Sequence, residues 1–201
     1  MYRTRSIQSS SSFLEKIFSF DFILFFSVLF LGIVSIFAQY SSSGGEFDYY
    51  AKSHLVRFLI FFLVFIIVSF IQVRFWYQSS YLLYILFFIL LLGVKYFGLV
   101  SSGSQRWINL YIINLQPSEL MKIGLILFLS KYYHRISSSD VNRLKFLILP
   151  IGVLLVPFIL VVTQPDLGTS ILILAGGVVV TWLAGVRLKF FTYCGIILIS
   201  L

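Results

Sequence analysis

The chain has 201 residues, of which 60% are hydrophobic, 19% aromatic and only 11% charged, and its mean hydropathy is +1.02. Soluble domains are about half apolar and about a quarter charged, so this composition excludes a soluble globular protein. The net charge of +8 does not call for a nucleic-acid partner, because basic residues collect in the cytoplasmic loops of membrane proteins.

Long hydrophobic runs predict an all-α fold, a polytopic transmembrane helix bundle with about six complete spans and a truncated seventh. Residues 1–19 are polar and basic and are expected to form a cytoplasmic N-terminal tail, and residues 20–201 are expected to form one transmembrane domain. A helix needs about 20 residues to cross the hydrocarbon core. The predicted spans are Phe20–Ala38, Leu55–Val73, Tyr81–Leu99, Glu119–Tyr133, Leu144–Val162 and Ser170–Ala184, with a seventh from about Phe190 that is cut off at Leu201.

The predicted connections are polar. They are a turn at Gln39–Ser53, a short link at Arg74–Ser80, a basic loop at Lys131–Lys145 and a tight turn at Thr163–Thr169. Pro150 and Pro157 lie inside the fifth span, so neighbouring groups or waters must satisfy the backbone groups that these prolines free.

The distribution of lysine and arginine predicts the orientation. One side of the membrane receives only Lys52 and Arg106, and Arg57, Lys95 and Lys122 lie within segments. The other side receives Arg3, Arg5, Lys16, Arg74, Lys131, Arg135, Arg143, Lys145, Arg187 and Lys189. Because basic loops stay in the cytoplasm, the N-terminus is predicted to be cytoplasmic.

Two glutamine-proline pairs precede apolar helical runs. Proline suits the first position of a helix, so we expect Pro117 and Pro165 there, with Glu119 third and Asp166 second in their helices. Carboxylates at these positions complement the positive end of a helix, which explains both residues without any function.

A functional interpretation is also open. Glu119 and Lys122 are three residues apart and share one helix face, and ionisable residues at membrane depth usually face a protein interior or a wet cavity. Thr169, Ser170 and Gly177 fall on the same side as Asp166 and predict a second polar stripe opening outward. A Glu119–Lys122 pair that only neutralises itself remains the alternative.

Several cations near the predicted outer surface have two interpretations. Arg106 beside Trp107 fits an interfacial belt or an anion contact, and Arg57 and Lys95 fit either snorkelling side chains or contacts to a phosphate-bearing headgroup. The alternation in Trp107–Leu115 allows a small hairpin or a short interfacial helix.

No cofactor is evident. The single cysteine, Cys194, excludes a disulfide within the chain, and His54 and His134 lie far from any metal-ligand spacing. We therefore expect no metal site, and a divalent cation is neither indicated nor excluded.

Four sequence blocks together resemble the SEDS family of RodA, FtsW and SpoVE, and most of all the N-terminal portion of RodA. The blocks are YSSSGG at 40–45, GSQRWINLYIINLQPSELMK at 103–122, TQPDLGTS at 163–170 and WLAGVRLKF at 182–190. The resemblance implies a peptidoglycan glycosyltransferase of cell elongation that polymerises lipid II at the outer face of the bacterial cytoplasmic membrane. It also implies a class B penicillin-binding protein as partner.

The resemblance also implies roles for single residues. Arg106, Glu119, Lys122 and Asp166 would line the substrate cavity, and Arg57 and Lys95 are further headgroup contacts. The catalytic residue is unknown, because the family's essential aspartate lies in a large outer loop after the seventh span, beyond residue 201. We therefore expect the truncated chain to be inactive on its own.

Two other functions remain as alternatives. One is a flippase or other transporter of the lipid-linked precursor, and the other is a non-catalytic membrane scaffold for a penicillin-binding protein. Alternating-access carriers often carry repeated halves and broken helices near the midplane, whereas the polar features here gather at one surface.

Overall fold

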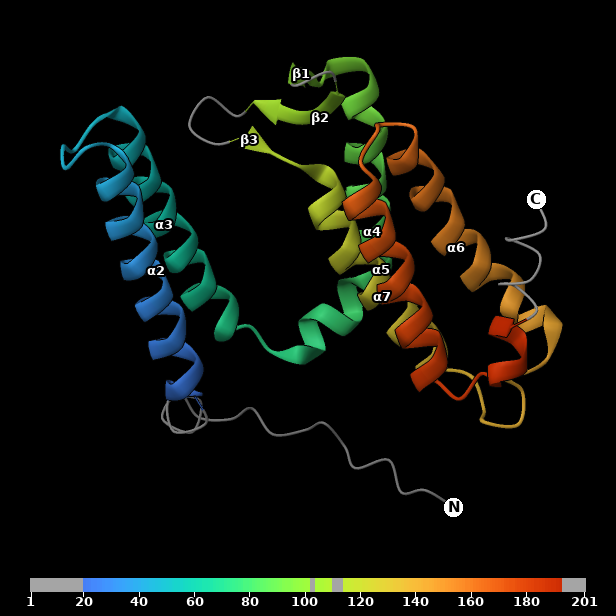
Figure 1. Cartoon of the computed structure of the whole chain (residues 1–201). Coiled ribbons are helices and arrows are strands. Elements are labelled where there is room, and N and C mark those ends of the chain that lie inside the picture. The colour runs from blue at the N-terminus through green and yellow to red at the C-terminus, as the bar shows by residue number, and fades with distance from the viewer. Residues whose placement is uncertain (1–19, 102–103, 110–113, 193–201) are drawn as a thin grey trace. The chain divides into compact units, whose positions relative to one another are not determined.

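The computed structural model describes residues 20–101, 104–109 and 114–192. It contains the six predicted helices, and in this part of the chain four of them, α2, α3, α4 and α6, are long and apolar enough to cross a membrane. The predicted polytopic helix bundle is therefore confirmed. The described residues fall into two compact units, with the boundary between Arg74 and Phe75 (Figure 1).

The first unit is a pair of helices, α2 (Phe22–Ser42) and α3 (Tyr49–Ser69). Both begin at an aspartate cap: Asp21 Oδ1 accepts from the backbone N–H of Leu24 at 3.0 Å, and Asp48 Oδ1 accepts from that of Ala51 at 2.8 Å. Asp21 therefore caps the start of this span and does not lie within it. The turn between the helices is shorter than predicted.

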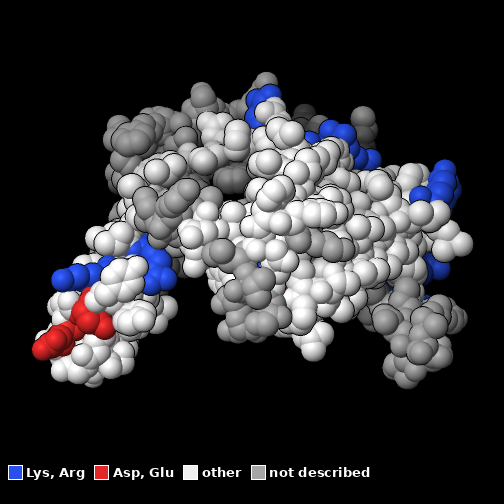
Figure 2. All heavy atoms as spheres, turned by 90° about the horizontal axis from the view of Figure 1, so that it is seen from above, with Lys and Arg blue, Asp and Glu red and all other residues white. Residues whose placement is uncertain are grey.

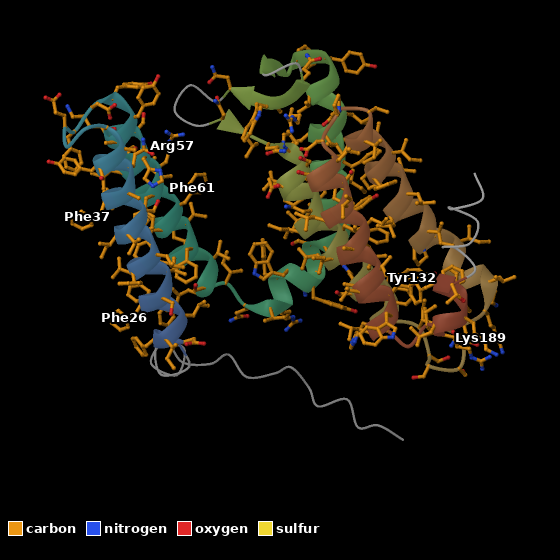
Figure 3. All side chains as sticks on the ribbon, in the orientation of Figure 1. Phe26, Phe37, Arg57, Phe61, Tyr132 and Lys189 are labelled. Atoms are coloured by element: carbon orange, nitrogen blue, oxygen red, sulfur yellow. The ribbon has the colours of Figure 1, made fainter. Side chains whose placement is uncertain are left out.

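Helices α2 and α3 pack through small residues. Gly32 is buried against the ring of Phe58, where a Cβ atom would overlap that ring, and Ser35 Oγ lies 2.6 Å from His54 Nε2. The outer surfaces are aromatic, with Phe26 and Phe37 exposed on α2 (Figure 3). In Figure 2, which looks down the helix ends, Lys, Arg, Asp and Glu side chains occupy a small part of the described surface. The exposed aromatic side chains of α2 suit hydrocarbon and not water.

Helix α4 (Val73–Phe97) begins earlier than predicted, so the expected link at Arg74–Ser80 is wrong. This segment contains no glycine or proline that would interrupt a helix. The ammonium of Lys131 donates to the carbonyl of Gln78 at 2.8 Å and lies 4.4 Å from the ring centre of Tyr81. These contacts give the Lys131 ammonium its partners and tie the start of α4 to the next helix.

The core of the second unit is formed by α4, α5 (Pro117–His134), α6 (Leu144–Val162) and α7 (Leu167–Leu183). Helix α7 packs against both α5 and α6. Gly177 on α7 faces Leu154 on α6, and Gly124 on α5 lies against Tyr84 and Phe87 on α4. The fully buried apolar side chains of this core include Leu91, Met121, Leu125, Leu129, Val161 and Ile173.

The two prolines of α6 have partners for the carbonyls that they free. A proline has no N–H for the carbonyl four residues earlier, which is that of Phe146 for Pro150 and that of Val153 for Pro157. The hydroxyl of Tyr132 donates to the Phe146 carbonyl at 3.0 Å, and that of Tyr84 to the Val153 carbonyl at 2.7 Å. The expectation that neighbours satisfy these groups is confirmed, and the bonds tie α6 to α5 and α4.

A small antiparallel sheet connects α4 to α5. Its strands are β1 (Leu99–Ser101), β2 (Ser104–Asn109) and β3 (Asn114–Leu115), in the order β1-β2-β3. Ile108 pairs with Leu115, so of the two alternatives for this stretch the hairpin is correct. Strand β2 also contacts α5.

Two predictions fall outside the described residues. They are the tail at residues 1–19 and most of the seventh run, including Cys194.

Candidate functional site

The starts of α5 and α7 differ from each other in their capping. Helix α5 begins as predicted, with Pro117 at its first position and Glu119 in its first turn. In α7 the prediction is wrong, because Asp166 is the cap itself and Pro165 precedes it. The Oδ1 atom of Asp166 accepts from the backbone N–H of Thr169 at 3.2 Å. Aspartate is among the most favoured capping residues, so the helix starts immediately after it.

Asp166 joins three segments of the second unit. Its Oδ1 atom lies 3.6 Å from Nη1 of Arg106 on β2, and its Oδ2 atom accepts from Nε2 of Gln116 at 2.8 Å. The Asp166 side chain is 9% exposed and that of Arg106 is 29% exposed. A buried carboxylate is costly unless it is paired and hydrogen-bonded, and here a guanidinium, an amide and a helix N-terminus surround it. The arrangement fixes β2 and both helix starts at one end of the unit.

Gln116 is a residue that the sequence reasoning missed as a member of the site. It occupies the cap position of α5, yet its side chain makes no capping hydrogen bond and reaches Asp166 instead. Glutamine is not one of the favoured capping residues, and its place directly before a helix-starting proline was the available signal. The parallel residue Gln164 donates to the carbonyl of Leu91 on α4 at 3.4 Å.

Glu119 and Lys122 form the ion pair that the sequence left undecided. Lys122 Nζ lies 2.8 Å from Glu119 Oε1, and the two side chains are 22% and 53% exposed, respectively. The pair is linked to the Asp166 contacts through the first turn of α5, where the backbone N–H of Glu119 donates to the carbonyl of Gln116 at 3.1 Å. An exposed pair of this kind adds little stability, so its geometry points to an accessible charged surface.

The polar stripe on α7 exists, but the prediction that it opens outward is wrong. Thr169 and Ser170 are buried, and so is Gly177, which faces α6. The hydroxyl of Ser170 donates to the carbonyl of Leu167 in its own helix at 2.8 Å. The stripe is therefore a packing surface, and the candidate site is confined to the helix starts.

The structure says less about the two cations predicted as headgroup contacts, Arg57 and Lys95. Arg57 belongs to the first unit, where it is exposed and its Nε donates to the carbonyl of Ser53 at 3.0 Å (Figure 3). Lys95 lies on α4, and its side chain is outside the described part of the structure. Their roles as headgroup contacts stay predictions. Among the residues that the structure describes, no three histidine, cysteine, aspartate or glutamate side chains form a group that could hold a metal ion.

A family model described as "Cell cycle protein", which covers FtsW, RodA and SpoVE, matches residues 15–201. The chain belongs to the FtsW/RodA/SpoVE family. It is 32% identical over 143 residues to the probable peptidoglycan glycosyltransferase FtsW of Buchnera aphidicola subsp. Schizaphis graminum, covering 71% of this chain and 40% of that protein. It is 42% identical over 105 residues to the peptidoglycan glycosyltransferase MrdB of Escherichia coli K12, covering 51% and 27%.

Two solved structures agree with the fold. The chain superposes on the rod shape determining protein RodA of Thermus thermophilus with a TM-score of 0.69 and 26% identity, covering 83% of this chain and 56% of that one. It also superposes on a chain from a peptidoglycan synthase complex that coordinates polymerization and crosslinking, with a TM-score of 0.71, 25% identity and coverage of 88% and 52%. The chain thus spans about half or less of the length of these relatives.

Proposed function

We propose that this protein is a peptidoglycan glycosyltransferase that polymerises lipid II, and that the second unit supplies part of the wall of its substrate cavity. The observation that carries the proposal is the network around Asp166, which holds Arg106 and the start of α5 together at one end of the unit. The names of the FtsW and MrdB relatives support the same activity.

The charges at this end suit the substrate. In lipid II polymerisation, an acceptor sugar hydroxyl attacks the anomeric carbon of a donor, and the bond from that carbon to a lipid diphosphate breaks. Negative charge develops on the leaving diphosphate, and fixed cations close to it stabilise such charge. Arg106 and Lys122 are the cations proposed for this role, with Glu119 orienting Lys122 at 2.8 Å.

Asp166 is proposed as a positioning residue and not as the base. Both of its carboxylate oxygens already have partners, and one of them caps α7. The proton of the acceptor hydroxyl therefore needs a different acceptor, which the family resemblance assigns to an aspartate beyond residue 201. We accordingly propose that residues 1–201 alone do not polymerise lipid II.

The charge distribution supports an orientation in the membrane. Asp166 and Gln116 lie at one end of α5 and α7, and Lys131 and Arg135 lie at the other end of α5. Basic ends of helices stay in the cytoplasm, so the Asp166 end is proposed to face outward from the bacterial cytoplasmic membrane. On this proposal residues 1–19 are a cytoplasmic tail and residues 20–201 a single transmembrane domain.

A class B penicillin-binding protein is the proposed partner. The structural similarity to a chain of a peptidoglycan synthase complex supports this in general terms.

The function is tested with fluorescent lipid II in liposomes that contain the complete protein and its partner. Glycan chains resolved on a gel are the expected result, and residues 1–201 alone should give none. Transfer of lipid II between leaflets without chain formation would instead identify a carrier, and co-purification with the partner without either activity would identify a scaffold.

A further inference from the structure

At the end of the second unit opposite Asp166, one asparagine joins two connections that are far apart in the sequence. Asn142, between α5 and α6, donates through Nδ2 to the carbonyl of Gly185 at 3.3 Å. Its Oδ1 atom accepts from the backbone N–H of Arg187 at 2.8 Å. One side chain thus holds the segment before α6 against the segment after α7.

The joined segments are also anchored in the core. Val141 and Val186, each next to one of the joined residues, are both 3% exposed. The segment after α7 turns at Gly185, whose φ of 97° is a conformation that residues with a side chain rarely adopt. The backbones that carry the neighbouring cations are therefore fixed and not free loops.

Four exposed cations lie on these segments or directly after them, Lys145 being in the first turn of α6. We call them the basic platform: Arg143, Lys145, Arg187 and Lys189 (Lys189 is labelled in Figure 3). The acidic residue on the same connections is Asp140, which lies 3.1 Å from Nη1 of Arg143. The platform therefore keeps a net positive charge.

Large apolar side chains lie directly beside the cations. Leu144 follows Arg143 and is 74% exposed, and Leu188, between Arg187 and Lys189, is 66% exposed. A soluble polyanion has no apolar part to contact these leucines. A phospholipid has a phosphate that can contact the cations and acyl chains that can contact the leucines. The ligand that fits both features is an anionic lipid.

We propose that the basic platform binds the phosphate headgroup of an anionic phospholipid, with the acyl chains against Leu144 and Leu188. The Asn142 bonds hold Arg143 and Arg187 in place for this contact. Lipid binding here does not depend on the glycosyltransferase function.

The proposal is tested with the complete protein in nanodiscs of phosphatidylcholine alone or with added phosphatidylglycerol. Native mass spectrometry counts the retained lipids, and a fluorescent phosphatidylglycerol titration gives the affinity. The unmodified protein should retain phosphatidylglycerol in preference to phosphatidylcholine. Equal retention of the two lipids would overturn the proposal.

Variants distinguish lipid binding at a site of fixed geometry from lipid attraction by positive charge alone. Arg143→Gln with Arg187→Gln keeps the backbone bond to Asn142 and should weaken binding roughly 30-fold, because each cation near an anionic headgroup contributes on the order of a few-fold to tenfold. Asn142→Ala changes no charge and should still weaken binding severalfold. The matched control Lys52→Gln, in the first unit, should leave the affinity unchanged.

Three results would contradict the proposal. They are unchanged affinity in the Arg143/Arg187 double variant, unchanged affinity in a folded Asn142→Ala variant, and displacement of the lipid by inorganic phosphate, which lacks acyl chains.

Discussion

Gln116 donates a 2.8 Å hydrogen bond to Asp166, a residue 50 positions away along the chain, and so joins the start of α5 to the start of α7. Gln116 occupies the cap position of α5, but its side chain makes no capping hydrogen bond to that helix. The bond places the start of α5, with Glu119 and Lys122, in a fixed relation to the strand that carries Arg106.

The first prediction concerns this bond. Gln116→Glu sets a second carboxylate against Asp166 and should lower lipid II polymerisation at least about tenfold, since a charge-assisted hydrogen bond contributes roughly 1.5–3 kcal/mol. Adding Asp166→Asn restores a donor and an acceptor in reversed order and should recover part of the activity. Activity of the double variant no higher than that of either single variant would argue against a role for the bond itself.

The second prediction separates the two roles of Asp166. Asp166→Ala removes both the cap of α7 and the partner of Arg106, whereas Asp166→Asn keeps an oxygen that can cap. Thermal unfolding should show Asp166→Ala destabilised by about 1 kcal/mol more than Asp166→Asn, because capping is worth roughly that amount. Polymerisation should fall in both variants. An Asp166→Asn protein with normal activity would mean that the carboxylate charge does not position Arg106.

The third prediction concerns the tyrosines whose hydroxyls donate to the carbonyls freed by the α6 prolines. Tyr84→Phe leaves the Val153 carbonyl without its partner and should destabilise the protein by about 1–3 kcal/mol. The matched control Tyr96→Phe, on the same helix and 75% exposed, should leave the free energy of unfolding unchanged.

A double-mutant cycle gives this test its specificity. In a Pro157→Ala background the helix can supply its own N–H to Val153, so the further cost of Tyr84→Phe should become small. An equal cost in both backgrounds would show that Tyr84 stabilises the core by packing and not by this bond.

The sequence predicted those helices that consist of long apolar runs. The bounds of α6, Leu144–Val162, agree with the prediction because basic and polar residues flank an apolar run that continues without a charge from Phe146 to Val162. Helix α4 was predicted to start too late, since the segment Arg74–Ser80 is polar; in the structure it is helical and is contacted by Lys131, which donates to the Gln78 carbonyl. Such a contact joins residues 53 positions apart, and local patterns carry no sign of it.

The candidate site was predicted in part for the same reason. The spacing of Glu119 and Lys122 puts them on one helix face, and the structure pairs them. The contacts of Asp166 with Arg106 and Gln116 depend on how α7 packs against α5, which no spacing within a segment reveals. The stripe of Thr169 and Ser170 has a helical period, but a period cannot distinguish a buried packing face from a cavity wall.

The central proposal is that the charged start of α5 acts on substrate, and lipid II polymerisation by Glu119→Ala and Lys122→Ala variants of the complete protein tests it most directly. Both should lose most or all activity while membrane insertion and partner binding survive, because the pair is exposed and adds little to stability. The control Lys52→Ala should polymerise normally. Normal chain formation by both the Glu119→Ala and Lys122→Ala proteins would contradict the proposal and make the pair a surface ion pair without a catalytic role.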